Sequence, residues 1–202
     1  MNRGLALATL AAIPVLAWIF HQLGHLEGLR PLTAIAIGLG LYWTLIVGAL
    51  WHCDGWSLRP YLPPGLTLLA LTAFVAACAL WAGTAPLQLS AHVSGAVALA
   101  ALINGTLEEA FWRGALIPRP GPSAQAVATG LFILWHLAPA LAMARLDAPG
   151  GGVGTILGAT VIAPFLMAAR LSSGTAGAGA IAHVLVNFLV FARLAAANGI
   201  PV

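Results

Sequence analysis

The stretch GTLEEAFWRGAL, from Gly105 to Leu116, places two adjacent acids and an arginine inside a hydrophobic run. From Tyr61 through Leu107 the chain has no Asp, Glu, Lys or Arg at all. Charged side chains are costly in an apolar environment unless they are paired or face a polar cavity, and in membrane spans they usually mark a function. The stretch is therefore a candidate site, and the apolar sequence around it indicates the fold class.

The composition is that of an integral membrane protein, because 61% of the 202 residues are hydrophobic and only 6% are charged. A soluble domain of this size needs far more ionic groups on its surface. The sequence has no lysine and no basic cluster, so no nucleic acid is expected as a partner. Two cysteines without CxxC spacing do not indicate a disulfide framework.

Seven apolar segments are long enough to span a bilayer, which takes about 20 residues in a helix. Proline- and glycine-rich breaks such as PRPGP and DAPGGG separate them. The first segment follows a single arginine and is interpreted as a retained helix rather than a cleaved signal peptide. The sequence thus predicts an all-α fold, a polytopic membrane bundle of about seven helices forming one integral-membrane domain over residues 1–202. The predicted spans are 4–23, 32–52, 63–83, 91–113, 122–144, 153–171 and 175–197.

The two acids are predicted to differ in their partners. Glu109 and Arg113 are four residues apart and can form an ion pair along one helix. Glu108 points about 100° away. It shares its face with Asn104, a possible hydrogen-bond partner, and with Trp112. Glu108 therefore needs further partners from other helices.

Histidines in two other predicted spans are candidates for that role. At 1.5 Å per residue, Glu108 lies about 15 Å, His136 about 20 Å and His183 about 6–13 Å from the membrane face at which their helices begin or end together. The three groups are expected to converge in one half of the bilayer. Asn187 lies one turn after His183 on the same helix face.

This set of side chains suits hydrolysis of a peptide bond within or beside the membrane. A carboxylate and a histidine can activate water, and a histidine can later protonate a leaving amine. A second histidine and an amide can hydrogen-bond the oxygen that becomes negative in a tetrahedral intermediate. One Glu and two His could also bind zinc, but there is no HExxH and no two of these histidines share a helix.

At these residues the sequence resembles the CPBP family, the CAAX-protease and bacteriocin-processing proteins also called Abi proteins. The family motifs are EExxxR, FxxxH and HxxxN. They match Glu108–Arg113, Phe132–His136 and His183–Asn187 in that order, and the resemblance covers roughly residues 91–193. Residues 91–197 would then form the catalytic helices.

The resemblance implies an intramembrane glutamic protease without a metal or other cofactor. Glu108 and His136 would activate the water, and the motif His183–Asn187 would form the oxyanion site. The pair Glu109 and Arg113 would support the first glutamate or bind substrate. The expected site residues are Glu108, Glu109, Arg113, His136, His183 and Asn187.

The expected function is that of an intramembrane endopeptidase in the bacterial inner membrane. Its partners would be the lipid bilayer and a membrane-anchored peptide or protein substrate, with C-terminal sorting signals as one option. A proton-coupled transporter that uses Glu108 and His136 as a relay is an alternative, although the sequence has no repeat pair. A non-catalytic membrane scaffold is another.

The remaining polar and aromatic residues of the spans are interpreted as structural. Tryptophans near the motifs are expected to pack or to lie at the membrane interface. Arginines near span ends are expected to lie in loops or to anchor headgroups. His21 and His25 have no acid within a span and are expected at the interface. The structural set comprises Trp112, Trp135, Arg119, Arg145 and Arg170.

Overall fold

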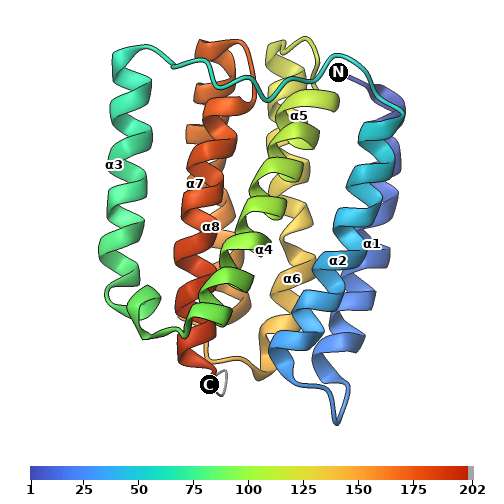
Figure 1. Cartoon of the computed structure of the whole chain (residues 1–202). Helices are drawn as coiled ribbons and strands as arrows, with labels where there is room; N and C mark the ends of the chain where they lie inside the picture. The colour runs from blue at the N-terminus through green and yellow to red at the C-terminus, as the bar shows by residue number, and fades with distance from the viewer. Residues whose placement is uncertain (200–202) are drawn as a thin grey trace.

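The computed structural model describes residues 1–199, and their long apolar runs form helices that stand side by side (Figure 1). The described residues contain no strand, so the all-α prediction is confirmed. The long helices are α1 (Arg3–His25), α2 (Pro31–Trp51), α3 (Gly65–Ala82), α4 (Ala91–Glu109), α5 (Pro122–Trp135), α7 (Gly151–Ser173) and α8 (Gly177–Ala197). The short ones are η1 (Ala85–Gln88), η2 (Ala110–Ala115), α6 (Leu137–Ala142) and η3 (Met143–Arg145).

Six of the described helical segments are long and apolar enough to cross a membrane, with Pro122–Arg145 counted as one segment. The exception among the seven predicted spans is α4, which carries Asn104, Glu108 and Glu109. Together with η2, α4 nevertheless runs the height of the bundle between its neighbours (Figure 1). It packs most extensively against α8. The chain is thus a multi-pass helical bundle in which α4 is more polar than the other long helices.

Two predicted spans are interrupted close to the motifs. The span 91–113 was expected to be one α-helix, but η2 is a π-helix in which the Leu116 N–H donates to the carbonyl of Phe111 at 2.9 Å. Such π segments are rare and frequently occur at functional sites. The span 122–144 breaks at His136, where α5 ends. Pro139 explains the break, because a proline clashes with the carbonyl four residues earlier and has no N–H to donate.

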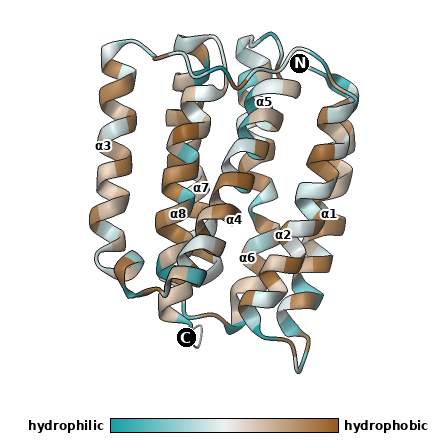
Figure 2. Cartoon of the chain, viewed as in Figure 1, coloured by the Kyte–Doolittle hydropathy of each residue, from teal (hydrophilic) through white to brown (hydrophobic). Residues whose placement is uncertain are grey.

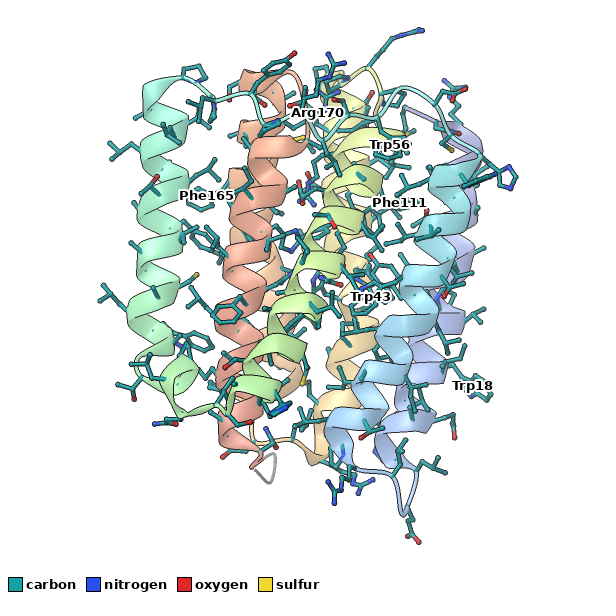
Figure 3. The ribbon with its side chains drawn as sticks, viewed as in Figure 1. Trp18, Trp43, Trp56, Phe111, Phe165 and Arg170 are labelled. Carbon is teal, nitrogen blue, oxygen red and sulfur yellow. The ribbon has the colours of Figure 1, made fainter. Side chains whose placement is uncertain are left out.

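The outer surface of the bundle is apolar, as a lipid-facing surface must be. Large hydrophobic side chains such as Leu7, Leu66 and Leu80 are more than half exposed, and hydrophobic residues recur along the long helices (Figure 2). Trp18 projects away from the bundle (Figure 3). Helix α3 is the least enclosed, since only Leu71 and Ala82 among its residues are buried.

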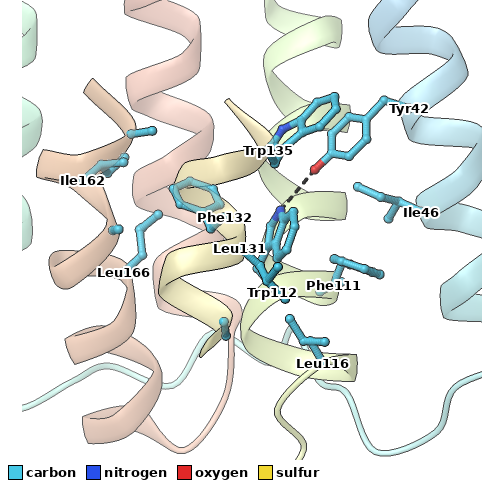
Figure 4. Close-up of a cluster of buried hydrophobic side chains, with 14 of the residues drawn as sticks. Tyr42, Ile46, Phe111, Trp112, Leu116, Leu131, Phe132, Trp135, Ile162 and Leu166 are labelled. Carbon is cyan, nitrogen blue, oxygen red and sulfur yellow. Dashed lines mark hydrogen bonds between the residues drawn. The ribbon is translucent and has the colours of Figure 1, made fainter. Parts of the chain in front are cut away.

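The core between α2, η2 and α5 is aromatic. Tyr42, Trp112, Phe132 and Trp135 are each at most 4% exposed. They come from three parts of the chain and meet in one cluster (Figure 4). This cluster lies beside the two acids and determines how they are held.

Helices α4 and α8 cross in close contact at Gly105. A Cβ atom added to Gly105 would lie 2.7 Å from the backbone nitrogen of Val184. Only glycine allows this approach, which small residues commonly provide between membrane helices. The crossing brings the end of α4 against His183, the neighbour of Val184 on α8.

The connection between α2 and α3, residues 52–64, passes over the end of the bundle at which the N-terminus lies (Figure 1). The carbonyl of Ser57 accepts from the N–H of Ala176 at 2.9 Å, and the carbonyl of Arg59 accepts from the Thr175 hydroxyl at 2.6 Å. Trp56 packs so closely on Gly114 of η2 that an added Cβ would lie 2.7 Å from the Trp56 Cβ. The connection thus joins the end of η2 to the start of α8.

Candidate active site

Glu109 forms the centre of a buried charge cluster. Its side chain is 0% exposed, and its Oε1 accepts from an Arg113 guanidinium nitrogen at 2.9 Å. The same oxygen lies 3.0 Å from Nδ1 of His183 on α8. The predicted ion pair of Glu109 and Arg113 is therefore present, and a histidine 74 residues away joins it.

Glu108 lies on the other side of the same histidine. Its Oε2 is 3.5 Å from Nε2 of His183, and its side chain is 2% exposed. Its Oε1 accepts a hydrogen bond from the indole N–H of Trp135 at 3.1 Å. His183 is thus held between the two adjacent carboxylates, one at each ring nitrogen.

This arrangement constrains the protons on His183. A carboxylate accepts but does not donate when ionised, so Nδ1 of His183 donates its proton to Glu109. Nε2 is then directed at Glu108. Arg113 and the two ring nitrogens of His183 are therefore polar partners of the two carboxylates. Such pairing is what makes buried carboxylates tolerable in a low-dielectric environment.

Phe132 connects His136 to this cluster. The Arg113 guanidinium carbon lies 4.1 Å from the centroid of the Phe132 ring. The rings of His136 and His183 lie with their centroids 4.6 Å and 6.0 Å from the same ring. Nδ1 of His136 donates to the carbonyl of Phe132 at 2.8 Å, which leaves Nε2 available for chemistry. His136 is half-buried at the break between α5 and α6.

Asn187 follows His183 by one turn of α8 and is 9% exposed. Its side-chain nitrogen is one of four buried polar atoms that have no hydrogen-bond partner among residues 1–199. Buried polar atoms are nearly always paired, so these atoms can receive a polar group of a bound molecule. The others are Oε2 of Glu108, Oε2 of Glu109 and one terminal nitrogen of Arg113.

The structure therefore brings four of the six expected residues into direct contact. These are Glu108, Glu109, Arg113 and His183. His136 joins them through Phe132, and Asn187 lies on the same helix as His183. No three His, Cys, Asp or Glu side chains within residues 1–199 are arranged to hold one metal ion.

Two structural interpretations from the sequence are wrong, and a third is incomplete. Asn104 accepts from the indole of Trp43 at 2.8 Å, and it makes no hydrogen bond to Glu108. Trp135 does more than pack, because it donates to Glu108. A tryptophan N–H buried in a span must find an acceptor, and that rule is the signal that could have singled Trp135 out beside the motif histidine.

Arg170 is the third correction, because it does not anchor a headgroup. It is 8% exposed, and its Nε donates to the carbonyl of Arg113 at 2.7 Å. Its other nitrogens donate to the carbonyls of Pro118 and Gly174. Arg170 therefore ties the end of the π-helical segment to the end of α7, near the connection that carries Trp56 (Figure 3). Arg119, in contrast, is exposed as expected.

The fold and the site together define a multi-pass helical membrane protein with a buried glutamate and histidine cluster at its centre. Residues 90–189, about half of the chain, match the family model described as Rce1-like, type II CAAX prenyl endopeptidase Rce1-like. All six expected site residues lie within this match. The chain belongs to this CAAX-protease family, and the resemblance that its motifs indicated is confirmed. No curated protein and no solved structure matches the chain significantly.

Proposed function

We propose that the chain is an intramembrane endopeptidase that hydrolyses a peptide bond of a membrane-anchored peptide or protein. One observation carries the proposal. Glu108 is buried in the family-matched stretch with its Oε2 unpaired and 3.5 Å from Nε2 of His183. A buried carboxylate with a free oxygen can bind a water molecule and take its proton, and the imidazole beside it can hydrogen-bond the substrate.

In the first step, the oxygen of a water molecule attacks the carbonyl carbon of the scissile peptide bond. Oε2 of Glu108 takes the proton that the water loses, and Nε2 of His136 helps to orient the water. This role suits His136, because the hydrogen bond of its Nδ1 to the Phe132 carbonyl at 2.8 Å fixes the ring and leaves Nε2 as the acceptor.

The carbonyl oxygen becomes negative in this step and needs donors. The side-chain nitrogen of Asn187 has no other partner, and Nε2 of His183 is held in place through the contact of Nδ1 with Glu109. Donors that are fixed before the reaction stabilise a developing oxyanion most effectively. Glu109 and Arg113 thus act on the reaction through His183.

In the second step, the tetrahedral intermediate collapses and the carbon–nitrogen bond breaks. The leaving amine takes up the proton that Glu108 received, with His136 as the second group able to transfer it. The products are a new carboxyl terminus and a free amine, and the sum is the addition of one water. No metal takes part in this scheme.

The substrate class follows from where the site lies. The catalytic groups are enclosed by helices with apolar outer faces, so a substrate reaches them most readily from the membrane. We place the protein in the bacterial inner membrane and expect a membrane-anchored substrate. A C-terminal sorting signal is one example of such a substrate.

The test is cleavage of a panel of membrane-anchored peptides by the purified protein in lipid nanodiscs. Glu108→Gln and His136→Ala should fold and lose cleavage by at least about a hundredfold, the usual scale of general acid–base catalysis. His25→Ala is the matched control, because Nδ1 of His25 makes the same 2.8 Å bond to a carbonyl four residues earlier but lies at an exposed helix end. That variant should cleave normally.

A chelator should leave cleavage intact. If a chelator abolishes cleavage and zinc restores it, the proposed water activation is wrong. If Glu108→Gln cleaves as fast as wild type, Glu108 is not the base. If the wild-type protein cleaves no peptide of the panel but moves protons across the membrane of sealed lipid vesicles, the endopeptidase proposal fails.

A further inference from the structure

We propose that Trp135 and Tyr42 are positioning residues for Glu108. They fix one carboxylate oxygen and so determine that the other, Oε2, is the atom that takes the proton from water. The inference rests on the proposed endopeptidase function and adds a role that the family motifs do not contain. Tyr42 lies on α2, outside the family-matched residues 90–189.

Oε1 of Glu108 accepts a hydrogen bond from Trp135. The Trp135 indole has one N–H and no acceptor, and it is 2% exposed, so it donates to Glu108 at 3.1 Å. Oε2 has no hydrogen-bond partner and faces Nε2 of His183. The two oxygens of Glu108 therefore have different surroundings, and Oε2 is the one that has no hydrogen-bond partner and is free to accept from a water molecule.

Aromatic contacts hold the ring of Trp135 in place. Its ring stacks on Tyr42 with centroids 3.6 Å apart and planes 17° apart, and Phe20 packs edge-on against it at 5.8 Å. The Tyr42 hydroxyl accepts from the indole N–H of Trp112 at 3.1 Å (Figure 4). Trp112 belongs to the segment that continues from Glu108. The contacts therefore form a closed ring from Glu108 to Trp135, to Tyr42, to Trp112 and back along the backbone.

The two acids differ in the donor that each one accepts from at Oε1. Glu109 accepts from the guanidinium of Arg113, a cation, at Oε1. Glu108 accepts from a neutral indole instead. A neutral donor orients a carboxylate without cancelling its charge, whereas a cation offsets it. Both acids contact His183, so the difference lies in the second partner, which is a cation for Glu109 and a neutral indole for Glu108 and suits Glu108 better to act as the base.

The experiment removes only the indole donor. Benzothienylalanine at position 135 places sulfur where Trp135 has N–H and keeps the shape of the ring. We expect kcat to fall about ten- to a hundredfold, the scale of one hydrogen bond to a charged group, with KM changed by less than about twofold. Trp135→Phe should lose at least as much. Tyr42→Phe keeps the ring stack but leaves the N–H of Trp112 unpaired, and we expect a smaller loss in kcat.

Trp43→Phe is the matched control. The Trp43 indole, like that of Trp135, donates a hydrogen bond to a residue of α4. Its acceptor is the amide oxygen of Asn104, at 2.8 Å, and not a carboxylate. We expect its kcat and KM to stay within about twofold of wild type even if its melting temperature falls, because the lost bond is structural. A wild-type kcat for the benzothienylalanine protein overturns the proposal, as does a loss no greater than that of the Trp43→Phe control.

A second measurement separates this inference from the endopeptidase function. In protein with ¹⁵N-labelled tryptophan, the indole N–H resonance of Trp135, assigned through Trp135→Phe, should shift upfield in Glu108→Gln because the acceptor loses its charge. The Trp43 resonance should stay in place. If no peptide is cleaved, the proposed function fails on its own, and this shift still decides whether Trp135 holds Glu108. An unchanged Trp135 resonance contradicts the inference.

Discussion

The substitution Gly105→Ala should push α4 away from α8 and displace the site. An added Cβ would lie 2.7 Å from the backbone nitrogen of Val184 and 2.9 Å from its Cα, and backbone cannot rotate out of the way. Carbon atoms pack at about 3.5–4.0 Å, so the two helices must separate by about 1 Å. His183 precedes Val184 and must move with it, away from both glutamates.

The magnitude follows from this displacement. Overpacking of this kind costs about 1–3 kcal/mol of stability. A misplacement of about 1 Å in a catalytic arrangement costs about a hundredfold in rate. We therefore expect both a lower melting temperature and about a hundredfold lower kcat/KM, measured on the folded fraction in detergent or nanodiscs.

Gly95→Ala is the control, because Gly95 lies on the same helix and an added Cβ there meets no atom within 4 Å. It should behave as wild type. If Gly105→Ala matches Gly95→Ala in both melting temperature and rate, the close crossing is not real. If Gly105→Ala is destabilised but the folded molecules cleave at the wild-type rate, the crossing does not position His183, and the reasoning from packing to catalysis is refuted.

Three further predictions concern the charge cluster. Gly179→Ala would place a Cβ 2.9 Å from Oε2 of Glu109, which is the mobile end of a side chain. We therefore expect kcat/KM to fall about tenfold with little change in melting temperature. An unaltered rate would show that Glu109 can shift freely. Arg170→Ala should lower the free energy of unfolding by about 2–4 kcal/mol, because buried carbonyls lose a charged donor. Arg119→Ala, at an exposed position, should leave it unchanged. Equal melting temperatures of the two variants would contradict this prediction. Arg113→Met should lower the free energy of unfolding by about 3–5 kcal/mol, because it leaves Glu109 without its cationic partner. Adding Glu109→Gln should recover part of that loss. Additive losses in the double-mutant cycle would argue against the ion pair.

The helical segments, and the convergence of the motif side chains in space, could be predicted from the sequence. Both depend on the length of the apolar runs and on the regular geometry of a helix. An apolar run of membrane length forms a helix, and a fixed rise per residue sets the depth of each polar group. That arithmetic put Glu108 and His183 in the same half of the bilayer, and their side chains lie 3.5 Å apart. The pairing of Glu109 with Arg113 needed only the spacing of neighbouring turns.

Contacts between distant helices could not be predicted in the same way. The acceptor of the Trp135 indole depends on how α5 packs against α4, and nothing in the local sequence of either helix states that register. The buried position of Arg170 was not predicted because one of its acceptors is the Arg113 carbonyl in a π-helix, where the sequence predicts an ordinary α-helix. Its other acceptors are the carbonyls of Pro118 and Gly174, which lie outside the helices. The break at His136 was overlooked although Pro139, three residues later, is its physical cause.

The aromatic ring through Tyr42 also bears on protein engineering. The recognisable protease motifs all lie within residues 90–189, yet Tyr42 belongs to an earlier helix that the family match does not reach. A chimera that transplants only the matched half into a relative would give Trp135 a foreign stacking partner and deprive Trp112 of its acceptor. Exchange of the second helix along with the motif helices is therefore the smallest graft that keeps the carboxylate's surroundings whole.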